Sequence, residues 1–67
     1  MEKEYVKHHW SFWEDDGVVE CYEHLDGDVI GGFYGITFDE LKDKIKDMSQ
    51  DELYGFICYN IEWYWTI

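Results

Sequence analysis

The chain has 67 residues, which is enough for a single domain spanning residues 1–67 and no more. It contains 16 acidic residues and five lysines, which give a formal net charge of −11. That charge repels nucleic acids and anionic membranes and attracts basic proteins, so neither nucleic acid nor a membrane is expected as a direct partner. Aromatic residues make up 21% of the chain, which argues against disorder.

The first half of the chain is predicted to form three strands separated by acidic turns. Aromatic and β-branched residues alternate along residues 5–13, which is typical of a strand. A turn at residues 14–17 precedes a second strand over residues 18–25, and a turn at residues 26–28 precedes a third over residues 29–34. These segments predict two successive hairpins.

The apolar pattern also predicts how these strands pair. A four-residue loop between the first two strands places Phe12 opposite Val19, so that apolar residues meet on one face. A three-residue loop then places Cys21 opposite Phe33. The glycine pair at residues 31–32 predicts a bulge or a close backbone approach in the third strand.

Helical signals follow the third strand. Residues 37–40 match a capping box with Thr37 as the N-cap, and apolar residues at helical spacing predict a helix over residues 38–48. A second capping box begins at Ser49 and predicts one extra helical turn that ends at Gly55.

Residues 56–67 are the most hydrophobic stretch, and their alternation predicts a long final strand whose apolar side faces the helix. The predicted fold class is α+β: a small, mainly antiparallel sheet with one helix packed on one face, in the order β-β-β-α-β. The other face has no second layer in this arrangement, so partner binding is expected there. The side chains predicted on that uncovered face are His9, Trp13, Glu20, Tyr22, His24 and Ile30.

No cofactor, metal site or catalytic residue is predicted. His8 and His9 are neighbours in a predicted strand and would point to opposite faces, so they cannot share a metal ion. His9 and His24 would supply only a weak site together. Cys21 is expected to point into the core, and so small a sheet leaves little room for a catalytic pocket, so an enzyme is not expected.

The two cysteines, Cys21 and Cys58, lie in apolar strand-like segments where buried, reduced thiols are usual. A disulfide between them would require their strands to be adjacent. No signal peptide or membrane-spanning run is recognised, so a cytoplasmic protein with reduced thiols is expected.

The acidic residues gather on the two predicted hairpin turns and on the strand between them, and residues 10–41 contain no lysine. Carboxylates on alternate residues of a strand recur every 6.6–7 Å or so, about the spacing of successive phosphates. Neighbouring aromatic residues would supply desolvated anchors. The predicted partner-binding residues are Glu14, Asp15, Asp16, Glu20, Tyr22, Glu23, Asp26, Asp28 and Trp13.

Such a surface predicts an inhibitor that mimics nucleic-acid charge and blocks a basic nucleic-acid-binding host protein or nuclease. A self-associating structural or regulatory module, forming a homodimer through the uncovered face or the last strand, is an alternative. An immunity protein against a nuclease toxin is another, and it would rely on the same physics.

The segment from Asp15-Asp16-Gly17 to His24 resembles the acidic hairpin and aromatic strand of small inhibitors that bacteriophages encode against host nucleic-acid enzymes. This class includes uracil-DNA glycosylase inhibitors, anti-restriction proteins and anti-CRISPR proteins. The resemblance covers residues 15–24 and the elements around them. It implies an anti-defence protein acting in the host cell cytoplasm, and no binding residue is carried over from it.

Overall fold

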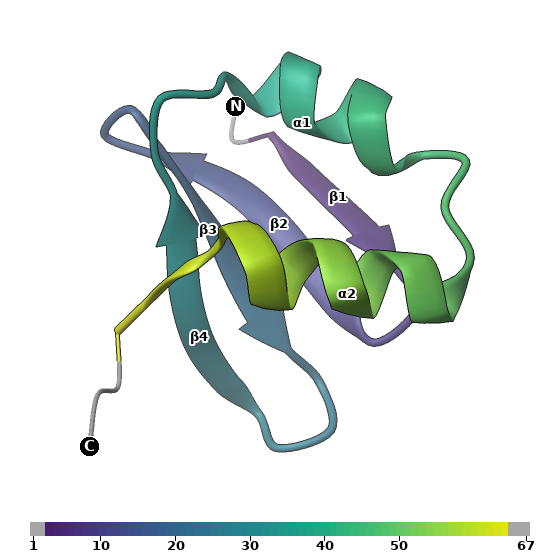
Figure 1. Cartoon of the computed structure of the whole chain (residues 1–67). Helices are drawn as coiled ribbons and strands as arrows, with labels where there is room; N and C mark the ends of the chain where they lie inside the picture. Colours follow the sequence, from purple (N-terminus) through teal and green to yellow (C-terminus); the bar gives the residue numbers. More distant parts are fainter. Residues whose placement is uncertain (1–2, 65–67) are drawn as a thin grey trace.

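The computed structural model describes residues 3–64 and contains, within them, five antiparallel strands and two helices. The strands are β1 (Glu4–Lys7), β2 (Trp10–Asp15), β3 (Val18–Glu23), β4 (Asp28–Phe33) and β5 (Glu62–Trp63). The helices α1 (Phe38–Ile45) and α2 (Gln50–Asn60) lie between β4 and β5 in the chain (Figure 1). The mixed α+β class is confirmed, and the predicted order β-β-β-α-β is corrected to β-β-β-β-α-α-β.

The predicted first strand, residues 5–13, is in fact a hairpin of β1 and β2. His8 and His9 form its turn, and His8 has a φ of +56°, in the left-handed region. Tyr5 therefore pairs with Phe12 and shares its face, whereas a continuous strand would place them on opposite faces. The prediction was wrong because this turn contains none of the glycine, asparagine or proline residues that normally mark one.

The β2–β3 hairpin turns more tightly than predicted. Asp16 and Gly17 form a two-residue turn with φ angles of +54° and +83°, as a type I′ turn requires. Phe12 consequently pairs with Cys21 rather than with Val19. The register differs by two residues, so each side chain keeps its expected face.

The β3–β4 pairing also differs from the prediction. Cys21 lies opposite Gly31, and Phe33 lies opposite Val19 rather than opposite Cys21. The register shifts between Cys21 and Tyr22, so the ladder contains a β-bulge. This bulge changes which residues of β4 share a face with those of β3.

Both helices begin at the predicted capping boxes. The Thr37 hydroxyl accepts from the Glu40 backbone N–H at 3.1 Å, and the Glu40 carboxylate accepts from the Thr37 N–H at 3.0 Å. Ser49 and Glu52 repeat the arrangement at the start of α2. These boxes satisfy backbone donors that the first helical turn would otherwise leave without partners.

The predicted strand over residues 56–67 is wrong. Residues 56–60 complete α2, the strand pairing of β5 is limited to Glu62–Trp63, and residues 65–67 lie outside the described part of the chain. Ile57 and Ile61 satisfy the period of a strand and are also four residues apart, as on one helical face. Both are buried, whereas Tyr59 between them is 92% exposed. Packing and the capping box therefore favour the helix, and Gly55 does not end it.

One buried cluster joins the sheet to both helices. The Phe33 ring stacks on Phe56 of α2 at a centroid distance of 5.9 Å, and the Trp10 ring stacks on Tyr54 at 6.2 Å. The helices thus contact the sheet face that carries Trp10 and Phe33 (Figure 1). The buried residues of this core are Trp10, Phe12, Val19, Cys21, Phe33, Phe38, Leu41, Ile45, Leu53, Ile57 and Ile61.

The glycine pair of β4 allows β5 to approach closely, as the sequence predicted. A Cβ on Gly31 would overlap the backbone oxygen of Glu62. A Cβ on Gly32 would lie 2.7 Å from the hydroxyl of Tyr64 and 2.8 Å from Val18. The absence of side chains at these two positions therefore permits both the backbone contact and the placement of Tyr64.

Neither helix in the described part of the chain is long and apolar enough to cross a membrane. The longer one, α2, has 11 residues, and a spanning helix needs about 20.

Replacing Gly31 with alanine is expected to destabilise the protein. The new methyl group would overlap the Glu62 backbone and approach Ile61, so β5 must shift. Overpacking of this kind costs about 1–3 kcal/mol. Urea denaturation followed by tryptophan fluorescence measures the change in the free energy of unfolding.

Gly55→Ala is the matched control, because Gly55 lies inside α2 with no atom within 4 Å of its added Cβ. Its free energy of unfolding should rise by about 0.5–1 kcal/mol, since alanine favours a helix over glycine. A Gly31→Ala protein as stable as the wild type would contradict the close approach of β5.

Candidate functional site

The sheet face opposite the helices carries acidic and aromatic side chains from four strands. Because paired residues share a face, Glu4 of β1, Trp13 of β2 and Glu20 of β3 lie side by side across the sheet. The same row continues through Gly32 to Glu62 of β5. We call this surface the open face; its residues are Glu4, Val6, Ser11, Trp13, Asp15, Val18, Glu20, Tyr22, His24, Val29, Glu62 and Tyr64.

Aromatic rings run along one end of the open face. The Trp13 and Tyr22 rings lie 6.2 Å apart, and Tyr22 meets His24 edge-on at 5.1 Å. Ser11 is buried, and its hydroxyl forms a hydrogen bond of 2.6 Å with Nε2 of His24. Neighbours therefore hold the half-buried rings of Trp13 and Tyr22 in place, which reduces the entropy that they would lose on binding a partner.

Glu20 is the central carboxylate of the open face. Burial raises its pKa above the ordinary value, and the neighbouring Asp15 raises it further. Hydrogen bonds from Tyr64 and Trp13 oppose that rise. The pKa of Tyr64 is itself raised to about 12, by burial, by a hydrogen bond with Tyr34 and by the charge of Glu20. Two carboxyl groups thus repel each other here, and no lysine belongs to this surface.

The lysines lie on the other side of the molecule, where β1 meets α1. Lys3 pairs with Asp39 at 3.5 Å, and Lys46 pairs with Asp43 at 2.9 Å. Lys7 donates to the backbone oxygen of Lys46 at 2.8 Å. The remaining two, Lys42 and Lys44, are on α1 itself, and Lys42 lies over the ring of Tyr5.

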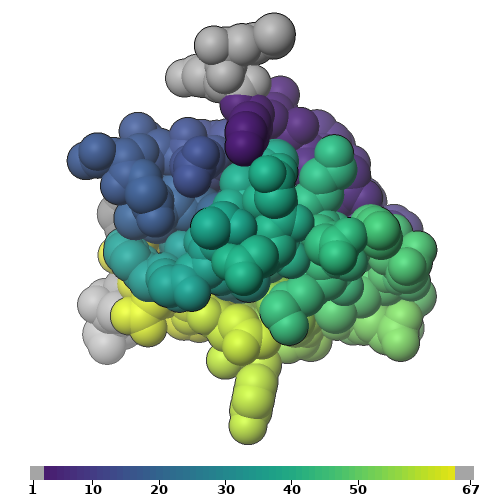
Figure 2. All heavy atoms as spheres, turned by 90° about the horizontal axis from the view of Figure 1, so that it is seen from above, coloured from purple at the N-terminus to yellow at the C-terminus, as the bar shows by residue number. Residues whose placement is uncertain are grey.

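Figure 2 shows α1, in teal to green, beside the β2–β3 hairpin, in blue.

The structure divides the predicted partner-binding residues into three groups. Trp13, Asp15, Glu20 and Tyr22 share the open face. Glu14 and Asp16 lie at the tip of the β2–β3 hairpin, where Glu14 pairs with Val19 and so faces the helix side. The third group, at the opposite end of β3, consists of Glu23, Asp26 and Asp28.

This third group forms a second acidic site near α2. Glu23 pairs with Trp10 and therefore shares the face that the helices cover. Burial raises the pKa of Glu23, Asp26 raises it further, and His9 opposes the rise. The two ends of β3 are about 17 Å apart, because its six residues are separated by steps of about 3.4 Å. The predicted surface is therefore two separate acidic sites.

Two of the residues predicted on the uncovered face lie elsewhere. His9 sits in the β1–β2 turn and forms a hydrogen bond of 2.9 Å with Gln50 of α2. Ile30 packs against the core. The sequence prediction missed Glu4, Glu62 and Tyr64. The Gly31–Gly32 pair, which requires a close neighbour, was a signal for Glu62 and Tyr64 but not for Glu4.

The thiols differ from one another. Cys21 is buried as predicted, and burial raises its pKa to about 12, so its thiolate is scarce at neutral pH. Cys58 is exposed on α2, which corrects its predicted place in a buried strand. Both are free, and no three acidic, histidine or cysteine side chains within residues 3–64 are grouped to hold a metal ion.

Glu20→Gln is expected to stabilise the protein at neutral pH. A raised folded-state pKa means that Glu20 favours folding only below its unfolded value near 4.5, and this benefit is lost as the pH rises through the folded value. The free energy of unfolding of the variant should exceed that of the wild type by on the order of 0.5 kcal/mol at pH 7 or so, after allowance for solvent screening. Near pH 3 the two proteins should be equally stable.

Thermal unfolding across this pH range measures the effect. Glu14→Gln, one strand away on the opposite face, is the control and should show a smaller gain. A Glu20→Gln gain that is equal at both ends of the pH range would contradict the repulsion between Glu20 and Asp15.

Comparison with protein-family models, with curated proteins and with solved structures found no match to this chain. The geometry and charge of the open face are therefore the basis for assigning a function.

Proposed function

We propose that this protein is an acidic inhibitor that uses its open face to bind a basic nucleic-acid-binding protein or nuclease in place of nucleic acid. The observation that carries the proposal is the absence of lysine from an open face that carries several carboxylates. The open face holds Glu4, Asp15, Glu20 and Glu62 without a lysine, whereas the lysines belong to β1 and α1 on the helix side.

The spacing of the carboxylates supports a partner with several cations. Glu4, Glu20 and Glu62 lie in one row and are separated by two strands each. Neighbouring strands are 4.7–4.9 Å apart, so successive carboxylates of the row are about 9.5 Å apart at the backbone. Surfaces that bind nucleic acid carry lysine and arginine side chains for several phosphates, and such a row can pair with more than one of them.

The aromatic residues favour arginine on the partner. Trp13 lies directly opposite Glu20, and Tyr22 is two residues along the same strand. A guanidinium group pairs with a carboxylate through two parallel hydrogen bonds and also stacks on aromatic rings. Half-buried tryptophan and tyrosine are common at the energetic centres of protein interfaces.

The repulsion between Asp15 and Glu20 also supports binding of a cation. Their proximity raises the pKa of Glu20 in the free protein. A cation placed between them would stabilise both charged forms and lower that pKa. Binding should therefore release a proton at pH values where Glu20 is partly protonated in the free protein, and it should weaken as the pH falls through that range.

The resemblance of the β2–β3 hairpin to phage-encoded inhibitors fits this role and adds an anti-defence function in a host cell. An immunity protein against a nuclease toxin would use the same surface. Both are binding functions without catalysis, and the genomic neighbourhood distinguishes them.

The proposal predicts that a double variant, Asp15→Asn with Glu20→Gln, loses partner binding. The wild type and the variant are immobilised, and bound proteins from a bacterial lysate are quantified by mass spectrometry at about 50 and 300 mM salt. The wild type should retain nucleic-acid-binding proteins or nucleases at low salt, with affinity roughly tenfold above that of the variant. The captured protein should then lose its binding to nucleic acid when the wild type is added.

Asp47→Asn with Asp51→Asn is the matched control, because it removes two charges from the helical region and leaves the open face intact. It should bind as the wild type does. Equal loss in both double variants would mean that total charge, and not the open face, determines binding. Capture that does not weaken at high salt would contradict charge mimicry.

A further inference from the structure

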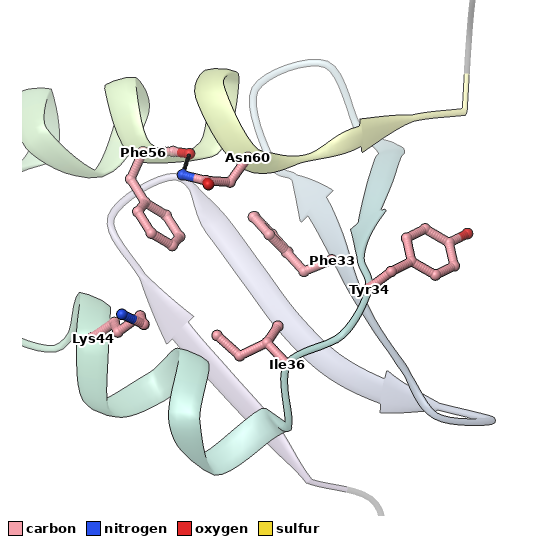
Figure 3. A pocket seen from close by; sticks show the side chains of 6 residues that line it. All are labelled: Phe33, Tyr34, Ile36, Lys44, Phe56 and Asn60. Atoms are coloured by element: carbon pink, nitrogen blue, oxygen red, sulfur yellow. Dashed lines mark hydrogen bonds between the residues drawn. The ribbon is translucent and has the colours of Figure 1, made fainter.

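A pocket lies on the helix side of the sheet, where the end of β4 meets both helices (Figure 3). Its volume is about 190 Å³. This surface is separate from the open face, so its ligand does not depend on the proposed inhibitory function. The lining residues are Phe33, Tyr34, Ile36, Lys44, Phe56 and Asn60.

The inner wall of the pocket is apolar and aromatic. Phe33 is buried, and its ring stacks on the half-buried Phe56 with an interplanar angle of 22°. The side chains of Ile36 and Phe56 point toward each other, and the Tyr34 ring points away (Figure 3). A cavity of about 150 Å³ lined by such residues accepts benzene, so this pocket has room for a single ring. It is smaller than the roughly 300–1,000 Å³ typical of sites for larger ligands.

The rim of the pocket is polar. The Asn60 amide donates to the Phe56 backbone oxygen at 2.9 Å, which fixes its position. Lys44 forms no ion pair or hydrogen bond with another residue in the range 3–64, in contrast to Lys3, Lys7 and Lys46. An ammonium group is therefore available at the polar edge of a ring-sized pocket whose inner wall is aromatic.

Two acidic residues near Lys44 in the sequence have hydrogen-bonded partners elsewhere, and the charge of Lys44 contributes to lowering the pKa of Glu40. Asp43 pairs with Lys46 at 2.9 Å, and the Glu40 carboxylate accepts from the Thr37 backbone N–H. The acids of the open face lie across the sheet, and at physiological salt their field is screened over about 8 Å. A carboxylate ligand can thus approach Lys44 despite the net charge of −11.

We propose that this pocket binds a small aromatic carboxylate, with its ring against Phe33 and Phe56 and its carboxylate paired with Lys44. Two kinds of ligand have this chemistry: a free arylalkanoic acid and the C-terminal phenylalanine of a peptide.

Amide chemical shifts of the full chain, titrated with phenylacetate, test the proposal. Saturable shifts are expected at Ile36 and Phe56, with a dissociation constant on the order of 1 mM for so small a ligand. Phenylacetamide, which has the same shape without the charge, should bind roughly threefold to fivefold more weakly. N-acetylphenylalanine tests the peptide source: tighter binding than phenylacetate favours a chain terminus, and weaker binding favours a free acid.

Lys44→Gln should reduce phenylacetate binding to the level of phenylacetamide and leave phenylacetamide binding unchanged. Lys42→Gln is the matched control on the same helix, because Lys42 lies over Tyr5 and does not line the pocket. It should bind phenylacetate as the wild type does. Equal affinity for phenylacetate and phenylacetamide in the wild type, or the absence of saturable shifts at Ile36 and Phe56, would overturn the proposal.

Discussion

Packing of both helices on one face of the sheet is the constraint on which the rest of this structure depends. The stacking of Phe56 on Phe33 and of Tyr54 on Trp10 fixes α2 against the sheet, and the apolar residues of α1 complete the same core. A domain of this size buries only about 60% of the surface of its unfolded chain. Its two helices are therefore enough to cover one face of the sheet. The other face is formed by the side chains of the strands alone.

The same packing determines where the charges lie. Lys7 bonds to the end of α1, and Lys42 covers the ring of Tyr5, so lysines help to attach the helix layer to β1. The open face has no lysine to balance its carboxylates, and Glu20 and Asp15 repel each other across adjacent strands. This arrangement lowers the stability of the free protein, and it agrees with the proposed binding function.

Local sequence patterns predicted where the helices begin better than where they end. Each capping box is a contact between residues three positions apart, so both could be recognised without knowledge of the fold. The end of α2 could not, because Ile57 and Ile61 fit a helix and a strand equally well, and burial against the sheet decided between them. The His8–His9 turn was missed for a related reason: tertiary pairing of β1 with β2 imposes it on residues without turn preference.

The candidate site was harder to predict because it runs across the strands rather than along them. The sequence analysis grouped Glu20 and Glu23 of β3 with the two acidic turns as one surface. In the structure Glu20 and Glu23 belong to opposite faces, and the two acidic turns lie at opposite ends of the strand. The row of Glu4, Glu20 and Glu62 depends on four successive registers, one of them altered by a bulge. Its spacing is set by the distance between strands, about 9.5 Å for two of them, and no longer by the 6.6–7 Å or so between alternate residues. For the proposed inhibitory function, the cations of a partner would therefore have to match this spacing across the sheet, with Trp13, between the first two carboxylates, as the proposed anchor.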